Sequence, residues 1–391
     1  MDTAFIYDPV WIPVKGERFV CACHFQDEAI RAHINLNGQL DYCSFCGESA
    51  KIVDFADFME YVASTISRYF VTINDANLPL ASSYYDKDDD LSIPGYVREG
   101  PFVTRVLAPS MEVPELLKEL SLVTNNNDLN HAIEDCFNDS ESWIKKEPLS
   151  ITTEEENSFD WEEFCHTIKH KRRFSIEDEH TSEDIFGYKK PVSDIIDRIF
   201  STIRQCGCIF TYREGWRLYR SRAFKDGRPT NFDDLTAPPD KRAKLNRMSP
   251  AGISMFYGAS NSATSIAEMG EYDGTLFVGR FTLKRDVRLI DLTSLPSPSY
   301  WTDTHIGDIR FLREFAEEVS KPILPDDRDI DYLPTQAFTE YVRYRFKEDG
   351  KNIDGILYNS SVHKGKNVVL FCDFRASRDW LELTDFKEHG R

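Results

Sequence analysis

The second half of the chain constrains the fold most, because short apolar runs alternate there with turns and with two amphipathic stretches. The stretches 308–319 and 335–346 have the apolar spacing of helices. Strands and helices do not alternate strictly, so the pattern predicts an α+β fold of mixed strands and helices. The runs expected to form strands are 208–212, 217–224, 254–257, 275–283, 287–293, 355–360 and 367–374.

The first half has apolar residues at helical spacing and is expected to be mainly helical. After Asp54, a plausible N-cap, apolar residues recur every three or four positions up to Phe70. The sequence therefore predicts three domains: a zinc-binding knuckle over 1–50, a mainly helical domain over 51–205 and a third domain over 206–391. Further helices are expected at 113–123, 129–137, 157–170 and 192–200.

Four residues near the start have the spacing of a zinc knuckle. Cys43 and Cys46 form a C-x-x-C pair before a glycine, and Cys21 and His24 form a similar pair about twenty residues earlier. Thiolate and imidazole are preferred zinc ligands, and two such pairs can converge on one tetrahedral ion. Cys21, His24, Cys43 and Cys46 are the expected set for a structural zinc. Cys23 or His33 could replace a member, and a small core of thiols without metal is the alternative.

Composition excludes several classes of function. The net charge is -19 and the pI is near 5.0, which argues against a nucleic-acid binder. No apolar run approaches the length of a membrane helix, and no signal peptide is recognisable. Nine cysteines, mostly scattered among hydrophobic residues, indicate a reduced, cytoplasmic chain rather than a disulfide framework.

The stretch 247–268 concentrates residues that suit an anionic, aromatic, ribose-bearing ligand. It contains Arg247, Tyr257 and Glu268 around a loop, a short strand and a helix that Asn261 or Ser262 can cap. Guanidinium groups bind phosphate in a bidentate manner. The sequence contains no glycine-rich phosphate loop. A nucleotide would therefore be held by side chains and loop amides, with Arg220 and Arg222 as further candidates.

Five separated blocks resemble the RES domain, a family named for an arginine, a glutamate and a serine. The resemblance covers roughly the last 185 residues, and the front half resembles the domain that precedes RES in longer members. It implies an ADP-ribosyltransferase-like fold and the consumption of NAD+ by the toxin of a bacterial toxin–antitoxin pair. The blocks are YRSRAF (219–224), NRMSPAGISMFYGASNSATSIAEM (246–269), IDLTSLP (290–296), TQAFTEYVR (335–343) and GILYNSSVHKGKNVVLF (355–371).

Carried over position by position, the named arginine is Arg220, the named glutamate Glu268 and the named serine Ser360. Ser361 could replace Ser360 if the strand register slips, and Tyr257 occupies the family's tyrosine position. The resemblance implies that Glu268 stabilises the ribosyl cation and that Tyr257 contacts the nicotinamide ring. It implies that Arg220 and Ser360 hold the dinucleotide. Secondary matches for binding NAD+ are Arg222 and Arg247.

The resemblance leaves the acceptor of the ADP-ribosyl group open. Water would make the chain a glycohydrolase, phosphate a phosphorylase and a protein side chain an ADP-ribosyltransferase. NAD+ degradation is the first expectation, with an antitoxin protein as partner and a homo-oligomer as a further expectation. An interaction protein with an inactive catalytic domain is another alternative. Arg173 and His180 loosely match the R-x4-6-H spacing of nucleases of the HEPN superfamily, but the pattern lies partly across a polar break.

Overall fold

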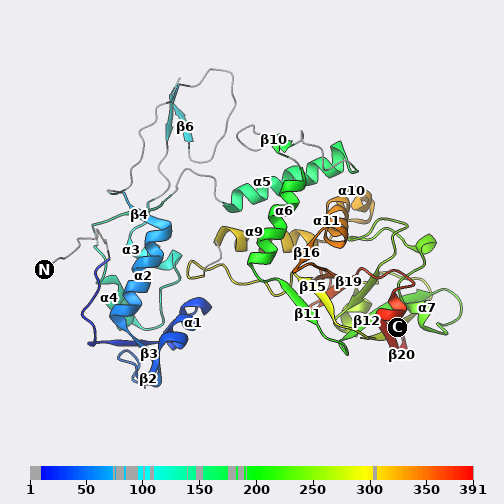
Figure 1. Ribbon diagram of the computed structural model, residues 1–391, viewed down its shortest axis with the longest axis horizontal. Helices are drawn as coiled ribbons and strands as arrows, with labels where there is room; N and C mark the ends of the chain where they lie inside the picture. The colour runs from blue at the N-terminus through cyan, green and yellow to red at the C-terminus, as the bar shows by residue number, and fades with distance from the viewer. Residues whose placement is uncertain are drawn as a thin grey trace. The chain divides into compact units, whose positions relative to one another are not determined.

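The computed structural model describes residues 10–73, 75, 83–84, 96–99, 102–105, 110–138, 140–146, 153–174, 182–183, 189–190, 192–302 and 306–390. The chain forms two compact units (Figure 1). The N-terminal unit contains the chain up to Ile151 together with Ser299–Asp303, and the C-terminal unit contains Thr152–Pro298 and Thr304–Arg391.

The N-terminal unit begins with a small antiparallel sheet that carries the cysteines. Its strands β1 (Phe19–Cys21), β2 (Gln39–Tyr42) and β3 (Ser49–Asp54) lie in the order β1–β3–β2. The turn η1 (Ala22–His24) and helix α1 (Glu28–Asn37) connect β1 to β2. The carboxylate of Asp27 accepts hydrogen bonds from the amides of Ala29 and Ile30 and so caps the start of α1.

Helix α2 (Phe55–Tyr69) supplies most of the core of this unit. The carboxylate of Asp54 caps it by accepting from the Ala56 amide, and the predicted apolar stripe is buried along it. Helices α3 (Val113–Glu119) and α4 (Asn127–Glu134) complete the helical part. The remaining strands are β4 (Phe70–Thr72), β5 (Ser83–Tyr84), β6 (Tyr96–Glu99), β7 (Phe102–Arg105) and β8 (Trp143–Lys145).

Two aromatic residues from far along the chain are built into the N-terminal unit. The indole Nε1 of Trp301 donates to the carbonyl of Leu120 at 2.8 Å, and the Trp301 side chain is buried. The hydroxyl of Tyr300 donates to Oε1 of Glu119 at 2.6 Å. The N-terminal unit therefore includes a segment that lies in sequence between strands of the other unit.

An eight-stranded mixed sheet forms the C-terminal unit. Every neighbouring pair is antiparallel except β15 and β18, which run parallel. In spatial order the strands are β11 (Ile209–Tyr212), β15 (Val287–Asp291), β18 (Gly355–Asn359), β19 (Lys366–Leu370), β13 (Phe256–Ala259), β12 (Arg217–Phe224), β14 (Thr275–Leu283) and β20 (Leu381–His389).

Both faces of this sheet are buried. Adjacent residues on one strand enter different cores: Val369 packs with the helices, whereas Leu370 packs in a second cluster with Phe256 and Phe281. The first core joins residues of α5 (Thr153–His166), α6 (Val192–Gln205), α9 (Ile306–Ser320) and α11 (Leu333–Tyr344). The helices therefore cover one face of the sheet (Figure 1).

The shorter elements of this unit connect the sheet and the helices. Two of them, α7 and α8, adjoin the candidate site. The elements are η2 (Thr167–Lys171), a π-helical turn, β9 (Ser182–Glu183), β10 (Lys189–Lys190), α7 (Phe232–Leu235), η3 (Asp240–Arg242), α8 (Ser262–Ala267), η4 (Pro325–Asp327), α10 (Arg328–Asp331), β16 (Lys347–Glu348), β17 (Lys351–Asn352) and α12 (Ser377–Trp380).

The predicted α+β class is confirmed, and β12 and β14 have the predicted bounds. Edge strand β20 was not predicted. Helices α5 and α6, which the sequence groups with the domain over 51–205, lie in the core of the C-terminal unit. The apolar stripe of an amphipathic helix shows which side of the helix is buried. It does not show which other part of the chain that side packs against, so the sequence did not assign α5 and α6 to the C-terminal unit.

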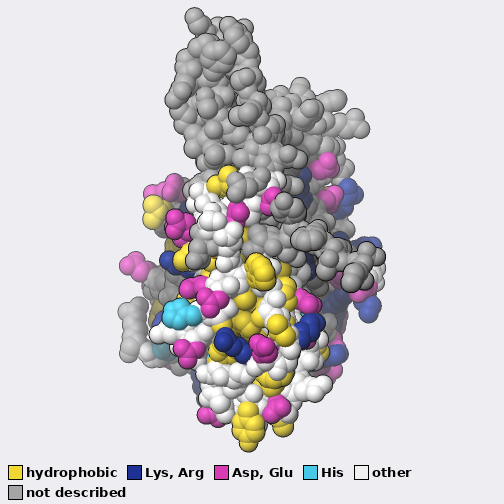
Figure 2. Space-filling model, turned by 90° about the vertical axis from the view of Figure 1, so that its left-hand side faces the viewer, with side chains coloured by type: hydrophobic (Ala, Val, Ile, Leu, Met, Phe, Trp, Pro, Cys, Tyr) yellow, Lys and Arg dark blue, Asp and Glu magenta, His cyan; other side chains and the backbone are white. Residues whose placement is uncertain are grey.

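The face drawn in Figure 2 has hydrophobic side chains scattered among acidic and basic ones, with no continuous basic stripe among the described residues. This agrees with the acidic composition. Among the described helices, none combines the length and the apolar character needed to cross a membrane.

Candidate functional site

The candidate glutamate lies at the end of a short helix that follows strand β13. Asn261 caps α8 by accepting from the amide of Thr264 at 2.8 Å, as the sequence predicts. Glu268 is the C-terminal cap of the helix, and Gly270, with a φ of 56°, turns the chain away. The carboxylate is therefore exposed at the end of a helix whose start is fixed.

Two side chains from the β18–β19 hairpin hold the carboxylate of Glu268. Ser360 Oγ lies 2.6 Å and Asn367 Nδ2 lies 2.5 Å from the same oxygen, Oε1 of Glu268. Ser360 Oγ also accepts from the amides of Val362 and His363, so its own hydrogen is donated to Glu268. Among the described residues, the exposed Ser361 has no such contact, so Ser360 is the one of the two candidate serines that meets Glu268.

The turn that carries Ser360 is fastened to helix α8. The ring Nδ1 of His363 lies 2.9 Å from Thr264 Oγ1. A Cβ on Gly365 would lie 1.9 Å from the same hydroxyl oxygen, so this close approach requires glycine. Lys366 and Ser260 exchange two hydrogen bonds, from the Ser260 amide to the Lys366 carbonyl at 2.8 Å and from the Lys366 amide to Ser260 Oγ at 3.2 Å.

Arg220 lies on β12 next to strand β13. Its Nη1 donates to the Tyr257 carbonyl at 2.6 Å, and its guanidinium carbon lies 5.5 Å from the centre of the Phe256 ring. Its Nε is buried and has no hydrogen-bond partner among the described residues. Burial, followed by the charge of Arg222, lowers the pKa of Arg220 to about 9. The guanidinium is still charged at neutral pH, so an anionic ligand would relieve an unfavourable burial.

Tyr257 and Tyr358 lie close to each other, and Tyr358 also lies close to Glu268. The Tyr257 hydroxyl is 2.9 Å from Ser249 Oγ, and burial raises the pKa of Tyr257. Burial raises the pKa of Tyr358 as well, and the neighbouring Tyr257 and Glu268 raise it further. Two aromatic rings and one carboxylate therefore share a small region.

Arg247 approaches this region from the loop before β13. Its Nη2 donates to the carbonyl of Lys321, and the guanidinium lies 5.3 Å from the centre of the Tyr332 ring. Its Nη1 is buried without a hydrogen-bond partner in the described part of the chain. Thr335 Oγ1 donates to the Arg247 carbonyl at 2.7 Å, which fixes the loop against α11.

Arg222 has a different environment. Its Nη1 and Nη2 donate to the carbonyls of Asp234 and Thr236 at 2.7 and 3.2 Å, and burial lowers its pKa. These contacts hold the α7 segment on the sheet. In this structure Arg222 serves the fold, whereas Arg220 and Arg247 each keep a buried N–H without a partner among the described residues.

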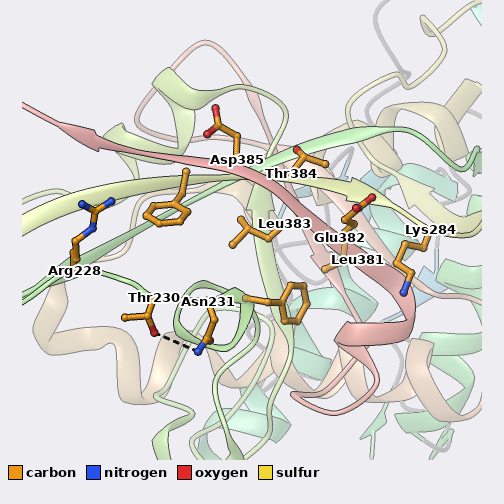
Figure 3. Close-up of a pocket in the computed structure, with 11 residues that line it drawn as sticks. Arg228, Thr230, Asn231, Lys284, Leu381, Glu382, Leu383, Thr384 and Asp385 are labelled. Carbon is orange, nitrogen blue, oxygen red and sulfur yellow. Dashed lines mark hydrogen bonds between the residues drawn. The ribbon is translucent and has the colours of Figure 1, made fainter.

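A cavity of about 790 Å³ lies elsewhere in this unit, between the α7 segment and edge strand β20. Arg228 lies at one end and Lys284 at the other, with Leu383 between them (Figure 3). None of the residues predicted to bind NAD+ lines this cavity. Its size alone gives no reason to place the dinucleotide there.

The cysteines of the N-terminal unit form a separate cluster. The ligand atoms of Cys21, Cys23, His24 and Cys46 all lie within 4.8 Å of one another, and Cys43 Sγ lies 3.4 Å from His24 Nε2. Cys21 and Cys46 are separated by 3.7 Å and Cys23 and Cys46 by 3.9 Å. These distances are near the roughly 3.8 Å expected between two thiolates on one tetrahedral zinc.

The group within 4.8 Å thus contains Cys21, His24 and Cys46 of the predicted set together with Cys23, a predicted substitute, while Cys43 lies against His24. The donor set fits zinc, because thiolate and imidazole are its usual ligands. His33 is not part of the cluster: its ring stacks on Tyr61 with the ring centres 3.7 Å apart. Of the nuclease-like pair, Arg173 Nε donates to the Ile168 carbonyl, and His180 lies outside the described residues.

Sequence reasoning did not identify Asn367, His363, Tyr332 or Tyr358 as members of the site. Asn367 had a recognisable signal, since it is a polar residue at the start of an apolar strand. The other three had none, because a tyrosine in a strand or helix and a histidine in a turn are ordinary.

Two family models match the chain. The model of the RES domain matches residues 216–385, and the model of the HEPN/RES N-terminal domain 1 matches residues 36–182. No curated protein matches the chain. Among solved structures, the crystal structure of the M. tuberculosis MbcT–MbcA toxin–antitoxin complex aligns at 12% identity, covering 50% of this chain and 91% of that one, with a TM-score of 0.29.

Proposed function

This chain belongs to the RES domain proteins that carry a HEPN/RES N-terminal domain, and on that premise we propose that it is an NAD+-consuming enzyme. The bond that it cleaves joins nicotinamide to ribose. One observation carries the proposal: Glu268 is exposed, yet its carboxylate is held by Ser360 across two chain segments. A carboxylate fixed in place, together with two arginines that each keep a buried N–H without a partner among the described residues, suits a ribosyl cation that is attached to a pyrophosphate.

In the proposed reaction the bond between C1′ of the ribose and the nitrogen of nicotinamide breaks. Its electron pair leaves with nicotinamide, which becomes neutral, and positive charge develops on the ribose. Glu268 stabilises that charge and orients the ribose hydroxyls, because an anion fixed before the reaction needs no reorganisation. With water as acceptor, its oxygen bonds to C1′ and its proton passes to solvent.

The remaining residues bind the dinucleotide. Arg220 and Arg247 each offer a buried N–H without a partner among the described residues, and such a group gains most when an anionic acceptor arrives. Tyr257 contacts the nicotinamide ring, and Ser360 adds a hydrogen bond near the reacting ribose. Arg222 supports the site indirectly by holding the α7 segment.

The experiment mixes the purified full chain with NAD+ and follows nicotinamide by chromatography. Release above a no-enzyme control supports the proposal, and no release at micromolar protein refutes it in favour of an interaction protein with an inactive catalytic domain. Product analysis then identifies the acceptor. ADP-ribose indicates a glycohydrolase, ADP-ribose 1-phosphate formed only with added phosphate indicates a phosphorylase, and adenine-labelled ADP-ribose retained on protein indicates a transferase.

The family also supports a place in a bacterial toxin–antitoxin or defence system, with an antitoxin protein as the partner. Expression of the chain alone should then lower cellular NAD+ and stop growth, and co-expression of the antitoxin should restore both. The cysteine cluster is proposed to hold a structural zinc, which would fix the small sheet of the N-terminal unit. We expect it to have no role in the chemistry, because a structural zinc with four protein ligands has no open position for a reacting group.

A further inference from the structure

Asn367 and Ser360 both contact Glu268, but Asn367 is a buried residue of a strand, whereas Ser360 lies in a turn. The side chain of Asn367 is 7% exposed, and it projects from strand β19, where it is paired with Tyr358 and Ala259 on the two neighbouring strands. Its Nδ2 lies 2.5 Å from Oε1 of Glu268. We propose that Asn367 is a positioning residue that fixes the direction of the Glu268 carboxylate, an inference that rests on the proposed function.

The distribution of donors supports this role. Asn367 and Ser360 both donate to Oε1, which has two lone pairs, so this oxygen is saturated. Oε2 of Glu268 has no hydrogen bond within the described residues, so it is the oxygen that is left for a ligand. Anchoring one oxygen of a carboxylate leaves the other aimed at the substrate and prevents rotation of the group.

Asn367 and Ser360 also differ in how firmly each is held. Ser360 lies in a turn after β18, and the proposed function gives its hydroxyl a second partner in the bound dinucleotide. When Ser360 shifts its hydrogen bond to the ligand, a buried donor on the central part of the sheet still holds Glu268. Asn367 therefore preserves the geometry of the carboxylate through the reaction, which Ser360 alone would not do.

The test measures steady-state nicotinamide release by full-length variants. Asn367→Leu keeps the approximate volume and removes the donor. We expect kcat to fall on the order of tenfold to a hundredfold, with KM for NAD+ within about threefold of wild type and an unchanged melting temperature. The control is Asn359→Ala, an exposed asparagine of the same hairpin that makes no side-chain hydrogen bond among the described residues, and its kcat should stay at the wild-type value.

Asn367→Asp provides a second, isosteric variant should the leucine variant fail to fold. It places a carboxylate against Glu268, so activity should be low at neutral pH and partly restored in acid, where one shared proton remakes the hydrogen bond. The wild-type protein contains the same neighbouring groups, His363 and Tyr358. Its pH profile of nicotinamide release is therefore the control, and it should show no recovery of activity in acid. Wild-type kcat in Asn367→Leu, or a pH profile of Asn367→Asp parallel to wild type, would overturn the positioning role alone. No release by the wild type would refute the proposed function itself.

Discussion

Glu268 and Ser360 stand 92 positions apart in the sequence, and the hydroxyl of Ser360 donates to Oε1 of Glu268 at 2.6 Å. Glu268 caps the end of helix α8, and Ser360 follows strand β18. Strand β13, which precedes α8, pairs directly with strand β19, which follows Ser360. Glu268 and Ser360, which the resemblance to the RES domain matches to the family's glutamate and serine, therefore form one hydrogen-bonded unit. Their predicted roles can be separated only by substitutions that remove the charge, the donor or the support one at a time.

Replacing Glu268 with glutamine removes the negative charge and keeps the size of the side chain. If the charge stabilises the ribosyl cation, nicotinamide release should fall by about a thousandfold, while KM for NAD+ changes little. Glu271→Gln is the matched control, because Glu271 is an exposed glutamate three positions further along the same turn. Equal activity in the Glu268 and Glu271 variants would remove Glu268 from the chemistry.

Ser360→Ala and Ser361→Ala compare two adjacent hydroxyls of which only the first contacts Glu268 among the described residues. Loss of the Ser360 donor should lower kcat by roughly tenfold to a hundredfold. The Ser361 variant should be affected less, because that side chain points to solvent. The comparison uses initial rates at saturating NAD+, and a greater loss in the Ser361 variant would contradict the register seen in the structure.

The sequence was most informative where a residue's partner is close in the chain. Asn261 caps α8 as its position before the helix predicts, and β12 and β14 have the predicted limits because their apolar runs end at turns. It was less informative about long-range contacts. The guanidinium of Arg222 is occupied by carbonyls of the α7 segment, a contact that the strand pattern around it does not specify.

The same limit applies to Asn367 and Trp301. A polar residue that opens an apolar strand is visible in the sequence, but its partner Glu268 is 99 positions away. Trp301 lies in sequence between strands β15 and β16 of the C-terminal unit and yet donates to Leu120, 181 positions earlier. Such long-range contacts depend on which helices and strands pack together. Hydrophobic periodicity shows which face of a helix or strand is buried, but it does not identify the element that covers this face.

Arg247→Lys should weaken NAD+ binding more than it slows the chemistry. Lysine keeps the charge but cannot supply both the donor to Lys321 and the buried Nη1 that lacks a partner among the described residues. We expect KM to rise about tenfold, equivalent to about 1.4 kcal/mol, with kcat within a few-fold of wild type. Arg217→Lys, an exposed arginine on β12, is the control. An unchanged KM for Arg247→Lys would leave the buried N–H without a role in binding.

Trp301→Ala tests whether the N-terminal unit depends on the segment Ser299–Asp303. Trp301 is 7% exposed and its indole satisfies the carbonyl of Leu120, so truncation leaves a cavity and an unpaired acceptor. The free energy of unfolding of this unit should fall by about 3–5 kcal/mol. Trp11→Ala, at a tryptophan that is 76% exposed in the same unit, should cost much less. Urea unfolding followed by circular dichroism makes the comparison, and equal midpoints would show that the segment is dispensable.

The cysteine cluster predicts about one zinc per chain in protein purified without chelator, measured by elemental analysis. Cys21→Ser and Cys46→Ser should each lower the zinc content strongly, because both thiols lie in the group within 4.8 Å. Cys165→Ala, a half-buried cysteine on α5, is the control and should keep the metal. Zinc content near zero in the wild type would refute the metal and leave a thiol core.

The fourth ligand can be decided by comparing Cys23 and Cys43. The sequence favours Cys43, whereas the interatomic distances group Cys23 with Cys21, His24 and Cys46. Cys43 is buried against Ile52 and lies beside His24, so it can pack without binding metal. If the distances hold in the metal-bound protein, Cys23→Ser should lower zinc affinity more than Cys43→Ser does, as measured by competition with a chromogenic chelator. The opposite order would restore the set that knuckle spacing predicts, because four ligands fill a structural zinc site and exclude the fifth.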